Sequence, residues 1–207
     1  MRTYDAVLFD LLTALLDSWS LWNAAAGSDA AGLRWRRRYL ELTYGANGYV
    51  PYESLVRRSA RESALTDAHG DRLLADWDTL APWPEAPRVV RDLMARVPVG
   101  IVTNCSKQLG QAAVARLGVP VTVAITAEEA GHYKPHARPY TMALDALGLG
   151  ASRVLYVAGS PYDLPGATAV GLDVYWHNRI GLSPLAVAPA PLVERATLDD
   201  LPSWVRA

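Results

Sequence analysis

Short apolar runs alternate with helical patterns along most of the chain, and this alternation restricts the possible folds more than any other feature. The apolar runs are rich in Val, Ile and aromatic residues and are bounded by Pro, Gly or polar residues; they span 4–10, 97–104, 121–126, 153–159 and 173–178. Between them lie the helical patterns 84–97, 106–118, 137–148 and 163–171. Near-continuous apolar character is typical of strands that are buried on both faces of a parallel sheet. The sequence therefore predicts an α/β fold with a doubly wound, Rossmann-like sheet.

One segment interrupts this rhythm. Within residues 15–82 the chain shows helical patterns at 33–45, 52–65 and 70–83 and no strand pattern. We therefore expect a helical cap domain over 15–82, inserted after the first strand, and a core domain made of 1–14 and 83–207. Such an insertion would lie beside the carboxyl end of the first strand, where doubly wound folds bind ligands.

Composition narrows the class of partner. The chain has 207 residues, of which 51% are hydrophobic, and its 20 basic and 21 acidic residues leave a net charge of −1. A nucleic-acid-binding protein usually has a large basic excess, so we expect no nucleic-acid partner. A single cysteine, Cys105, excludes an internal disulfide. The beginning of the sequence does not resemble a secretory signal, and no apolar run is long enough to span a membrane. The expected location is the cytoplasm, with no membrane partner.

Polar side chains stand at or just after the ends of four predicted strands. They are Asp10, Thr103, Asn104, Lys134, Ser160 and Asp163. A single aspartate in such a place is more often a helix cap than a catalytic group. Because parallel strands end at the same edge of a sheet, however, these side chains are expected to converge. The sequence therefore predicts an active site that combines two carboxylates, an ammonium group, hydroxyls and an amide.

This order of residues resembles the haloacid dehalogenase superfamily over nearly the whole chain. The stretches "KPHARPYTMALDALGL" and "DLPGATAVGLDVYWHNR" carry much of the resemblance. It implies that Asp10 is a nucleophile, that Thr103 binds the anion of the substrate, that Lys134 steadies both, and that Asp163 completes the site.

Leu12 separates the branches of this superfamily. In its phosphatases, the residue two positions after the nucleophile is an aspartate that acts as general acid; Leu12 has no proton to give. The early acid of the fourth-strand motif is also replaced, by Ala158, Gly159 and Ser160. Asp10 and Asp163 alone would offer Mg²⁺ few ligands. The chain is more similar to the L-2-haloacid dehalogenase branch, which implies a site without metal or other cofactor.

The resemblance to this branch implies further roles. It assigns halide binding to Arg36 and Asn104, carboxylate binding to Thr103 and the backbone of Leu11 and Leu12, and supporting roles to Tyr140 and Ser160. Arg36 follows Trp35 in a matching cap helix, although a run with Arg37 and Arg38 is equally typical of a solvated helix face. Two departures stand out. Ala14 occupies the position of a threonine, with Thr13 one residue earlier, and the loop 158–160 lacks the serine and asparagine of the branch.

We therefore expect metal-free hydrolytic dehalogenation of a small 2-haloacid through an ester on Asp10. A Mg²⁺-dependent phosphohydrolase of small phosphate esters is the first alternative, and a non-catalytic binding protein with the same fold is the second. The expected partner is a small anionic substrate, and the sequence leaves a homodimer open.

Overall fold

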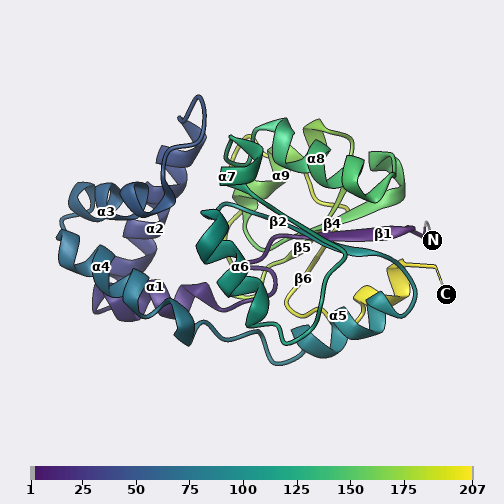
Figure 1. The fold of residues 1–207 in the computed structure, drawn as a ribbon, viewed down its shortest axis with the longest axis horizontal. Coiled ribbons are helices and arrows are strands. Elements are labelled where there is room, and N and C mark those ends of the chain that lie inside the picture. Colours follow the sequence, from purple (N-terminus) through teal and green to yellow (C-terminus); the bar gives the residue numbers. More distant parts are fainter. Residues whose placement is uncertain (1–2, 207) are drawn as a thin grey trace.

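A six-stranded parallel sheet forms the centre of the protein (Figure 1). The computed structural model describes residues 3–206, so residues 1, 2 and 207 of the predicted core domain lie outside the described residues. The strands are β1 (Ala6–Phe9), β2 (Val99–Thr103), β3 (Val123–Thr126), β4 (Val154–Ala158), β5 (Asp173–His177) and β6 (Val193–Arg195). Their order is β3-β2-β1-β4-β5-β6, and all adjacent pairs are parallel. The predicted Rossmann-like α/β fold is confirmed.

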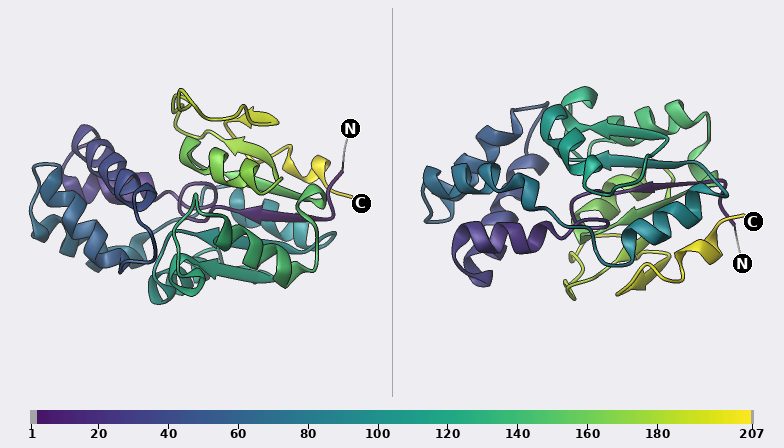
Figure 2. Two further views of the ribbon diagram at one scale, coloured as in Figure 1. Left: turned by 90° about the horizontal axis from the view of Figure 1, so that it is seen from above. Right: turned by 60° about the horizontal axis from the view of Figure 1, so that its bottom comes forward.

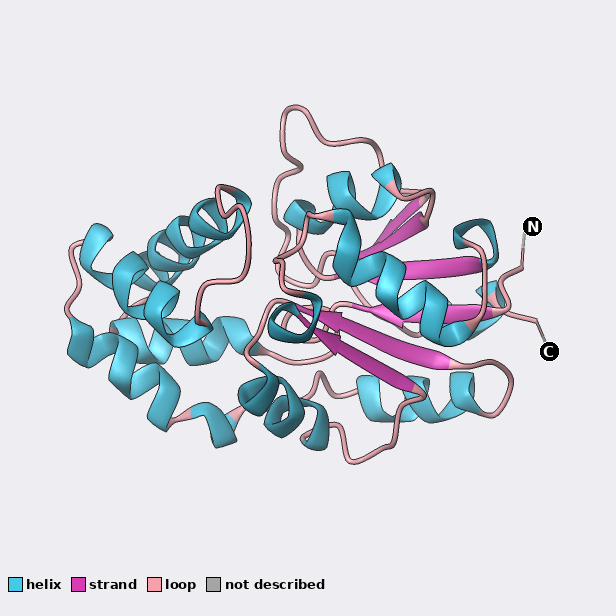
Figure 3. Cartoon of the chain, turned by 45° about the horizontal axis from the view of Figure 1, so that its top comes forward, coloured by secondary structure: helices cyan, strands magenta, loops and turns pink. Residues whose placement is uncertain are grey.

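Helices cover both faces of the sheet (Figure 3). One face packs against α5 (Ala86–Met94) and α6 (Lys107–Ala115), and the other against α8 (Ala137–Leu147) and α9 (Leu164–Ala169). Strand β1 alternates between the two cores: Val7 and Phe9 join the first, while Ala6 and Leu8 join the second. This alternation follows from the two-residue period of a strand and explains why nearly every position of β1 is apolar. The shorter elements are α7 (Ala127–Ala130), η2 (Ala151–Arg153), η3 (Pro161–Asp163) and η4 (Leu201–Trp204).

The cap helices lie beyond the carboxyl ends of the strands (Figure 2). They are α1 (Ser18–Ala26), α2 (Asp29–Tyr44), α3 (Tyr52–Glu62) and α4 (Asp67–Ala75), followed by η1 (Trp77–Thr79). The chain enters and leaves this group through two linkers that pair with each other. Asp17 N–H donates to Ala81 O at 2.8 Å, and Trp83 N–H donates to Leu15 O at 2.9 Å. The paired linkers hold the cap helices directly above the end of β1.

Two elements differ from the sequence prediction. Helix α1 lies in a part of the cap where no helix was predicted, and β6 lies in the Pro- and Ala-rich tail. Strand β6 is only three residues long and two of them are exposed, so it has no apolar pattern to recognise. No helix within residues 3–206 combines the length and the apolar character needed to cross a membrane.

Candidate active site

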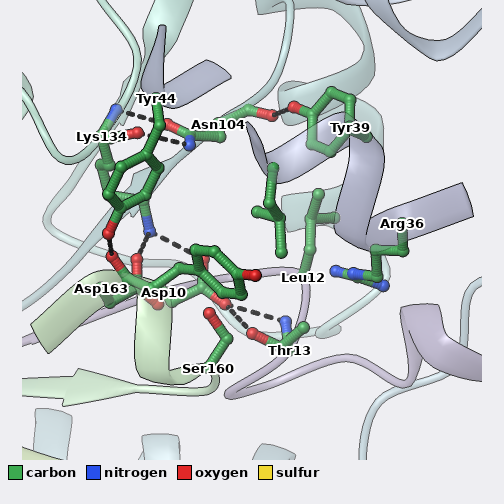
Figure 4. Close-up of a pocket in the computed structure, with 12 residues that line it drawn as sticks. Asp10, Leu12, Thr13, Arg36, Tyr39, Tyr44, Asn104, Lys134, Ser160 and Asp163 are labelled. Atoms are coloured by element: carbon green, nitrogen blue, oxygen red, sulfur yellow. Dashed lines mark hydrogen bonds and ion pairs between the residues drawn. The ribbon is translucent and has the colours of Figure 1, made fainter. Parts of the chain in front are cut away.

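Asp10 follows the last residue of β1 and is only 6% exposed. Its Oδ2 accepts hydrogen bonds from Thr13 N at 2.9 Å, Thr13 Oγ1 at 2.6 Å and Ala14 N at 3.3 Å. Its Oδ1 accepts one from Lys134 Nζ at 2.8 Å (Figure 4). The tight turn after β1 therefore folds its own N–H groups back onto the carboxylate, which fixes the orientation of the side chain.

Lys134 lies between two carboxylates and is 3% exposed. Its Nζ lies 2.8 Å from Asp10 Oδ1, 2.8 Å from Asp163 Oδ1 and 2.9 Å from the hydroxyl of Tyr156. The Asn104 amide holds the backbone of this lysine: Lys134 N donates to Asn104 Oδ1 at 2.7 Å, and Asn104 Nδ2 donates to Lys134 O at 3.1 Å. An ammonium group has three donors, so these three oxygens use all of them.

Asp10 and Asp163 share one ammonium group but differ in pKa. Burial raises the pKa of Asp10, but the charge of Lys134 and hydrogen bonds from Lys134 and Thr13 outweigh burial, so the net pKa is lowered. Burial and the charge of Asp10 raise the pKa of Asp163 to about 6, against the opposing effect of Lys134. Burial lowers the pKa of Lys134, but the two carboxylates reverse this and raise it. Separated pKa values of this kind divide the roles of nucleophile and base between two acids.

Arg36 faces the site from helix α2 and is 6% exposed. Its Nη1 donates to Ser18 Oγ at 2.7 Å, and this hydroxyl in turn donates to the carbonyl of Leu12, in the turn after Asp10. The guanidinium lies 4.1 Å from the centre of the Trp19 ring. A guanidinium has five N–H donors. Among residues 3–206, the Ser18 hydroxyl is the one hydrogen-bond acceptor of this side chain.

The two neighbouring arginines point elsewhere. Arg38 pairs with Glu41 and Glu62 at 2.8 and 2.6 Å on the outside of the cap. Arg37 is exposed and has no ion pair or hydrogen bond within the described part of the chain. Consecutive residues of a helix point about 100° apart, so one arginine of the run faces inward. The structure thus places Arg36 at the site and the other two outside it.

A small cavity of about 40 Å³ connects these groups. Asp10, Lys134 and Asp163 lie on one side of it and Arg36 on the opposite side, beyond Leu12 (Figure 4). The lining residues are Asp10, Leu12, Thr13, Arg36, Tyr39, Leu40, Tyr44, Asn104, Lys134, Ser160, Tyr162 and Asp163. A water molecule needs roughly 10–15 Å³ measured in this way, so the cavity has room for about three water-sized groups.

Two kinds of free donor lie at or next to this cavity. The backbone N–H groups of Leu11 and Leu12 have no acceptor among the described residues, and neither does the Ser160 hydroxyl, which lines the cavity. Adjacent free N–H groups after a strand are suited to binding an anion.

Two predicted binding residues lie elsewhere. Thr103 is buried, does not line the cavity, and its hydroxyl has no partner in the described structure. Tyr140 is fully buried behind Asp163, where its hydroxyl donates to the backbone oxygen of Asp163 at 3.4 Å. Neither side chain reaches the cavity, because each points into the packing of the sheet and helices. Their contacts with substrate therefore stay a prediction.

Thr13 is a site residue that the sequence prediction missed. It was noted only as a departure from the branch pattern, yet its hydroxyl is the closest partner of Asp10. The turn that brings it there packs on Gly159, where an added Cβ would lie 2.2 Å from Ala14 N and 2.3 Å from Thr13 Oγ1. The two departures in the sequence are therefore coupled: the threonine reaches Asp10 in a turn that only a glycine at position 159 accommodates.

Aromatic side chains of the cap form part of the cavity wall. Tyr39 donates to the backbone oxygen of Asn104 at 3.0 Å, and Tyr44 donates to the backbone oxygen of Tyr162. Both bonds join the cap to the core above the reacting groups. Nothing in the spacing of the cap aromatic residues along the sequence distinguishes these two from the rest.

Comparisons with known proteins agree with this geometry. The profile of the haloacid dehalogenase-like hydrolases matches residues 4–171. A (S)-2-haloacid dehalogenase from Pseudomonas sp. (strain YL) is 31% identical over 199 residues, which cover 87% of this chain and 85% of the relative. Haloacetate dehalogenase H-2 from Moraxella sp. (strain B) is 28% identical over 201 residues, which cover 88% of this chain and 89% of the relative.

Solved structures give the same result. A dehalogenase determined with an intermediate complex aligns with a TM-score of 0.87 and 26% identity, over 100% of this chain and 99% of the other. An L-2-haloacid dehalogenase aligns with a TM-score of 0.87 and 26% identity, over 100% of both chains. The resemblance predicted from the strand-end residues is confirmed. The chain belongs to the haloacid dehalogenase-like hydrolases.

Proposed function

We propose that this protein hydrolyses the carbon–halogen bond of a small 2-haloacid through an ester on Asp10. One observation carries this proposal: a buried carboxylate with a lowered pKa and a buried guanidinium with unused donors line the same small cavity. The first is a nucleophile and the second is a receptor for a departing anion. Relatives named as haloacid dehalogenases support the same reaction.

The first step is a displacement at C2 of the substrate. An oxygen of ionised Asp10 donates an electron pair to C2, and the halide leaves with the electron pair of the bond that breaks. The new bond is an ester between C2 and Asp10. Arg36 receives the halide, because a fixed cation in a site shielded from water stabilises charge that appears in the transition state. The free N–H groups of Leu11 and Leu12 and the Ser160 hydroxyl hold the substrate carboxylate.

The second step is hydrolysis of the ester. Asp163, with a pKa of about 6, is ionised at neutral pH and can take a proton from water. The resulting hydroxide attacks the carboxyl carbon of Asp10, and Lys134, 2.8 Å from Asp10 Oδ1, stabilises the oxyanion. The ester then breaks between this carbon and the oxygen bound to C2, Asp163 returns the proton to this oxygen, and a 2-hydroxyacid is released. C2 is attacked once only, so its configuration should be inverted.

We propose that this chemistry needs no metal. Magnesium prefers several oxygen ligands at octahedral positions. The carboxylates that line the cavity are Asp10 and Asp163, and both point at the Lys134 ammonium. The other oxygen of Asp10 is surrounded by N–H and O–H donors. These residues do not fit a magnesium site, and Leu12 supplies no acid for a phosphate leaving group.

A substrate panel tests the proposal. Chloroacetate, both enantiomers of 2-chloropropionate and p-nitrophenyl phosphate are incubated with the protein, with Mg²⁺ or with a chelator, and halide and phosphate release are both measured. We expect halide release that the chelator does not reduce. Phosphate release that requires Mg²⁺ would favour the phosphohydrolase, and release of neither product would favour the non-catalytic binding protein.

A further inference from the structure

Tyr156 lies at the centre of the polar network although it does not line the cavity. It is on β4, fully buried, and belongs to the core that faces α8 and α9. Its ring packs edge-on against Tyr140, with the ring centres 5.3 Å apart. Its hydroxyl accepts a hydrogen bond from Lys134 Nζ at 2.9 Å. The sequence around it, "RVLYVAG", is typical of a buried strand and gives no sign of this contact.

The contact completes the coordination of the lysine. Two of the three ammonium donors of Lys134 bind Asp10 and Asp163, and Tyr156 binds the third. A buried donor without a partner costs free energy, so the ammonium would otherwise turn or shift to find one. Ala158, two residues further along the same face of β4, has no polar group to take this place. Tyr156 is thus the hydroxyl of β4 that holds Lys134 between the carboxylates.

The position of the Lys134 ammonium also bears on the second carboxylate. The charge of Lys134 lowers the pKa of Asp163, against the larger effect of burial, so an ammonium that shifts away from Asp163 would let this pKa rise. The charge of Asp163 in turn contributes to the raised pKa of Tyr140, from α8, and of Tyr44, from the cap, although burial has the larger effect on both. Tyr140 donates to the backbone oxygen of Asp163 and Tyr44 to that of Tyr162.

We propose that Tyr156 is a positioning residue that fixes the Lys134 ammonium between the two carboxylates. It acts through Lys134 and touches no reacting atom. Its kinetic effect rests on the function proposed above, whereas its effect on the titration of Asp163 does not. Without this role, Tyr156 would look like any other buried aromatic residue of the core.

Tyr156→Phe and Tyr140→Phe form a matched pair, because each removes one hydroxyl from adjacent buried rings. For Tyr156→Phe we expect the acid limb of the kcat–pH profile to move upward by about one pH unit, as loss of a hydrogen bond to a charged group implies. The plateau kcat should fall about tenfold while KM changes little, since Tyr156 does not line the cavity. For Tyr140→Phe we expect the midpoint of the acid limb of the kcat–pH profile to stay unchanged.

Carboxyl ¹³C NMR of Asp163 gives a second readout that needs no substrate. The pKa of Asp163 should rise in Tyr156→Phe and stay unchanged in Tyr140→Phe, with Asp163→Asn used to assign the signal. An unchanged pKa in Tyr156→Phe, or equal shifts in both variants, would overturn the proposal. If the protein releases no halide, the NMR titration still decides the role of Tyr156, so the two proposals fail separately.

Discussion

The charged groups on the two sides of the cavity differ in how completely they are hydrogen-bonded. On the core side, Asp10 accepts four hydrogen bonds and every donor of Lys134 has a partner. On the cap side, Arg36 is equally buried but has one hydrogen bond, and its guanidinium lies against the Trp19 ring. The core side is organised before substrate arrives. The cap side keeps donors free for a charge that appears only during the reaction.

This difference is informative because unused donors are costly in a buried site. Burial lowers the pKa of Arg36, although nearby tyrosines and carboxylates oppose this effect. A protein that needed the arginine only for packing could have used an apolar residue there at lower cost. Retention of a buried, under-bonded cation therefore favours an anion-binding role.

The largest loss of activity is expected when the nucleophile on the core side of the cavity is replaced. Asp10→Asn keeps the shape of the side chain but removes the nucleophilic charge, so kcat for halide release should fall by at least ~10⁴-fold. Asp145→Asn makes the same change on the exposed face of α8 and should keep the wild-type rate. Initial rates of halide release measure both. A tenfold loss or less in Asp10→Asn would mean that water attacks the substrate directly.

Changes on the cap side should separate three consecutive arginines. Arg36→Ala should reduce kcat by about 10²–10³-fold, the usual loss when one preorganised donor to a developing charge is removed. Arg36→Lys should recover part of this, because lysine keeps the charge but lacks the planar fork. Arg37→Ala and Arg38→Ala, which lie outside the cavity, serve as controls. Equal losses at all three positions would indicate a general electrostatic effect and not a halide site.

The pH dependence should separate the two half-reactions. Raising the pH through about 6 removes the proton from Asp163 and allows it to activate water, so steady-state kcat should rise across this range. Asp10, whose pKa is lowered, stays ionised at pH 5 and can still form the ester. Rapid-quench measurements at pH 5 should therefore show a burst of halide of about one equivalent per site, followed by slow turnover. Asp163→Asn should show the same burst at every pH; a burst that disappears together with steady-state turnover would contradict this division of roles.

The smallest effect is expected at Thr13. Thr13→Val removes one of four hydrogen bonds to Asp10 without changing the shape of the side chain, and should lower kcat about tenfold. Thr13→Ser keeps the hydroxyl and should stay close to wild type. Steady-state kinetics on chloroacetate compare the two variants. Equal activity of Thr13→Val and wild type would show that the two backbone N–H groups suffice to hold the carboxylate.

The sequence predicts most of the core fold, but fewer of the residues that hold the site residues in position. The parallel sheet follows from the alternating pattern, and Asp10, Lys134 and Asp163 meet because parallel strands end at one edge. Thr13 was not assigned a role because its hydroxyl reaches Asp10 only in the turn that Gly159 permits. Tyr156 lies in an apolar strand pattern that is typical of the core. The hydrogen bond between its hydroxyl and Lys134 becomes apparent only when the neighbouring segments of the chain are in place. Contacts of this kind depend on three-dimensional packing that spacing along the chain does not encode.

Isotope labelling in a single turnover gives the most direct measurement of the ester on Asp10. The protein, in excess over 2-chloropropionate, is allowed to react in heavy-oxygen water, and the product and the peptide that contains Asp10 are analysed by mass spectrometry. If Asp10 attacks C2, the new hydroxyl oxygen of the product comes from the aspartate, so the product is unlabelled and the label is found in Asp10. If the label appears in the product after this first turnover and is absent from Asp10, the reaction has no ester intermediate and the proposed mechanism is wrong.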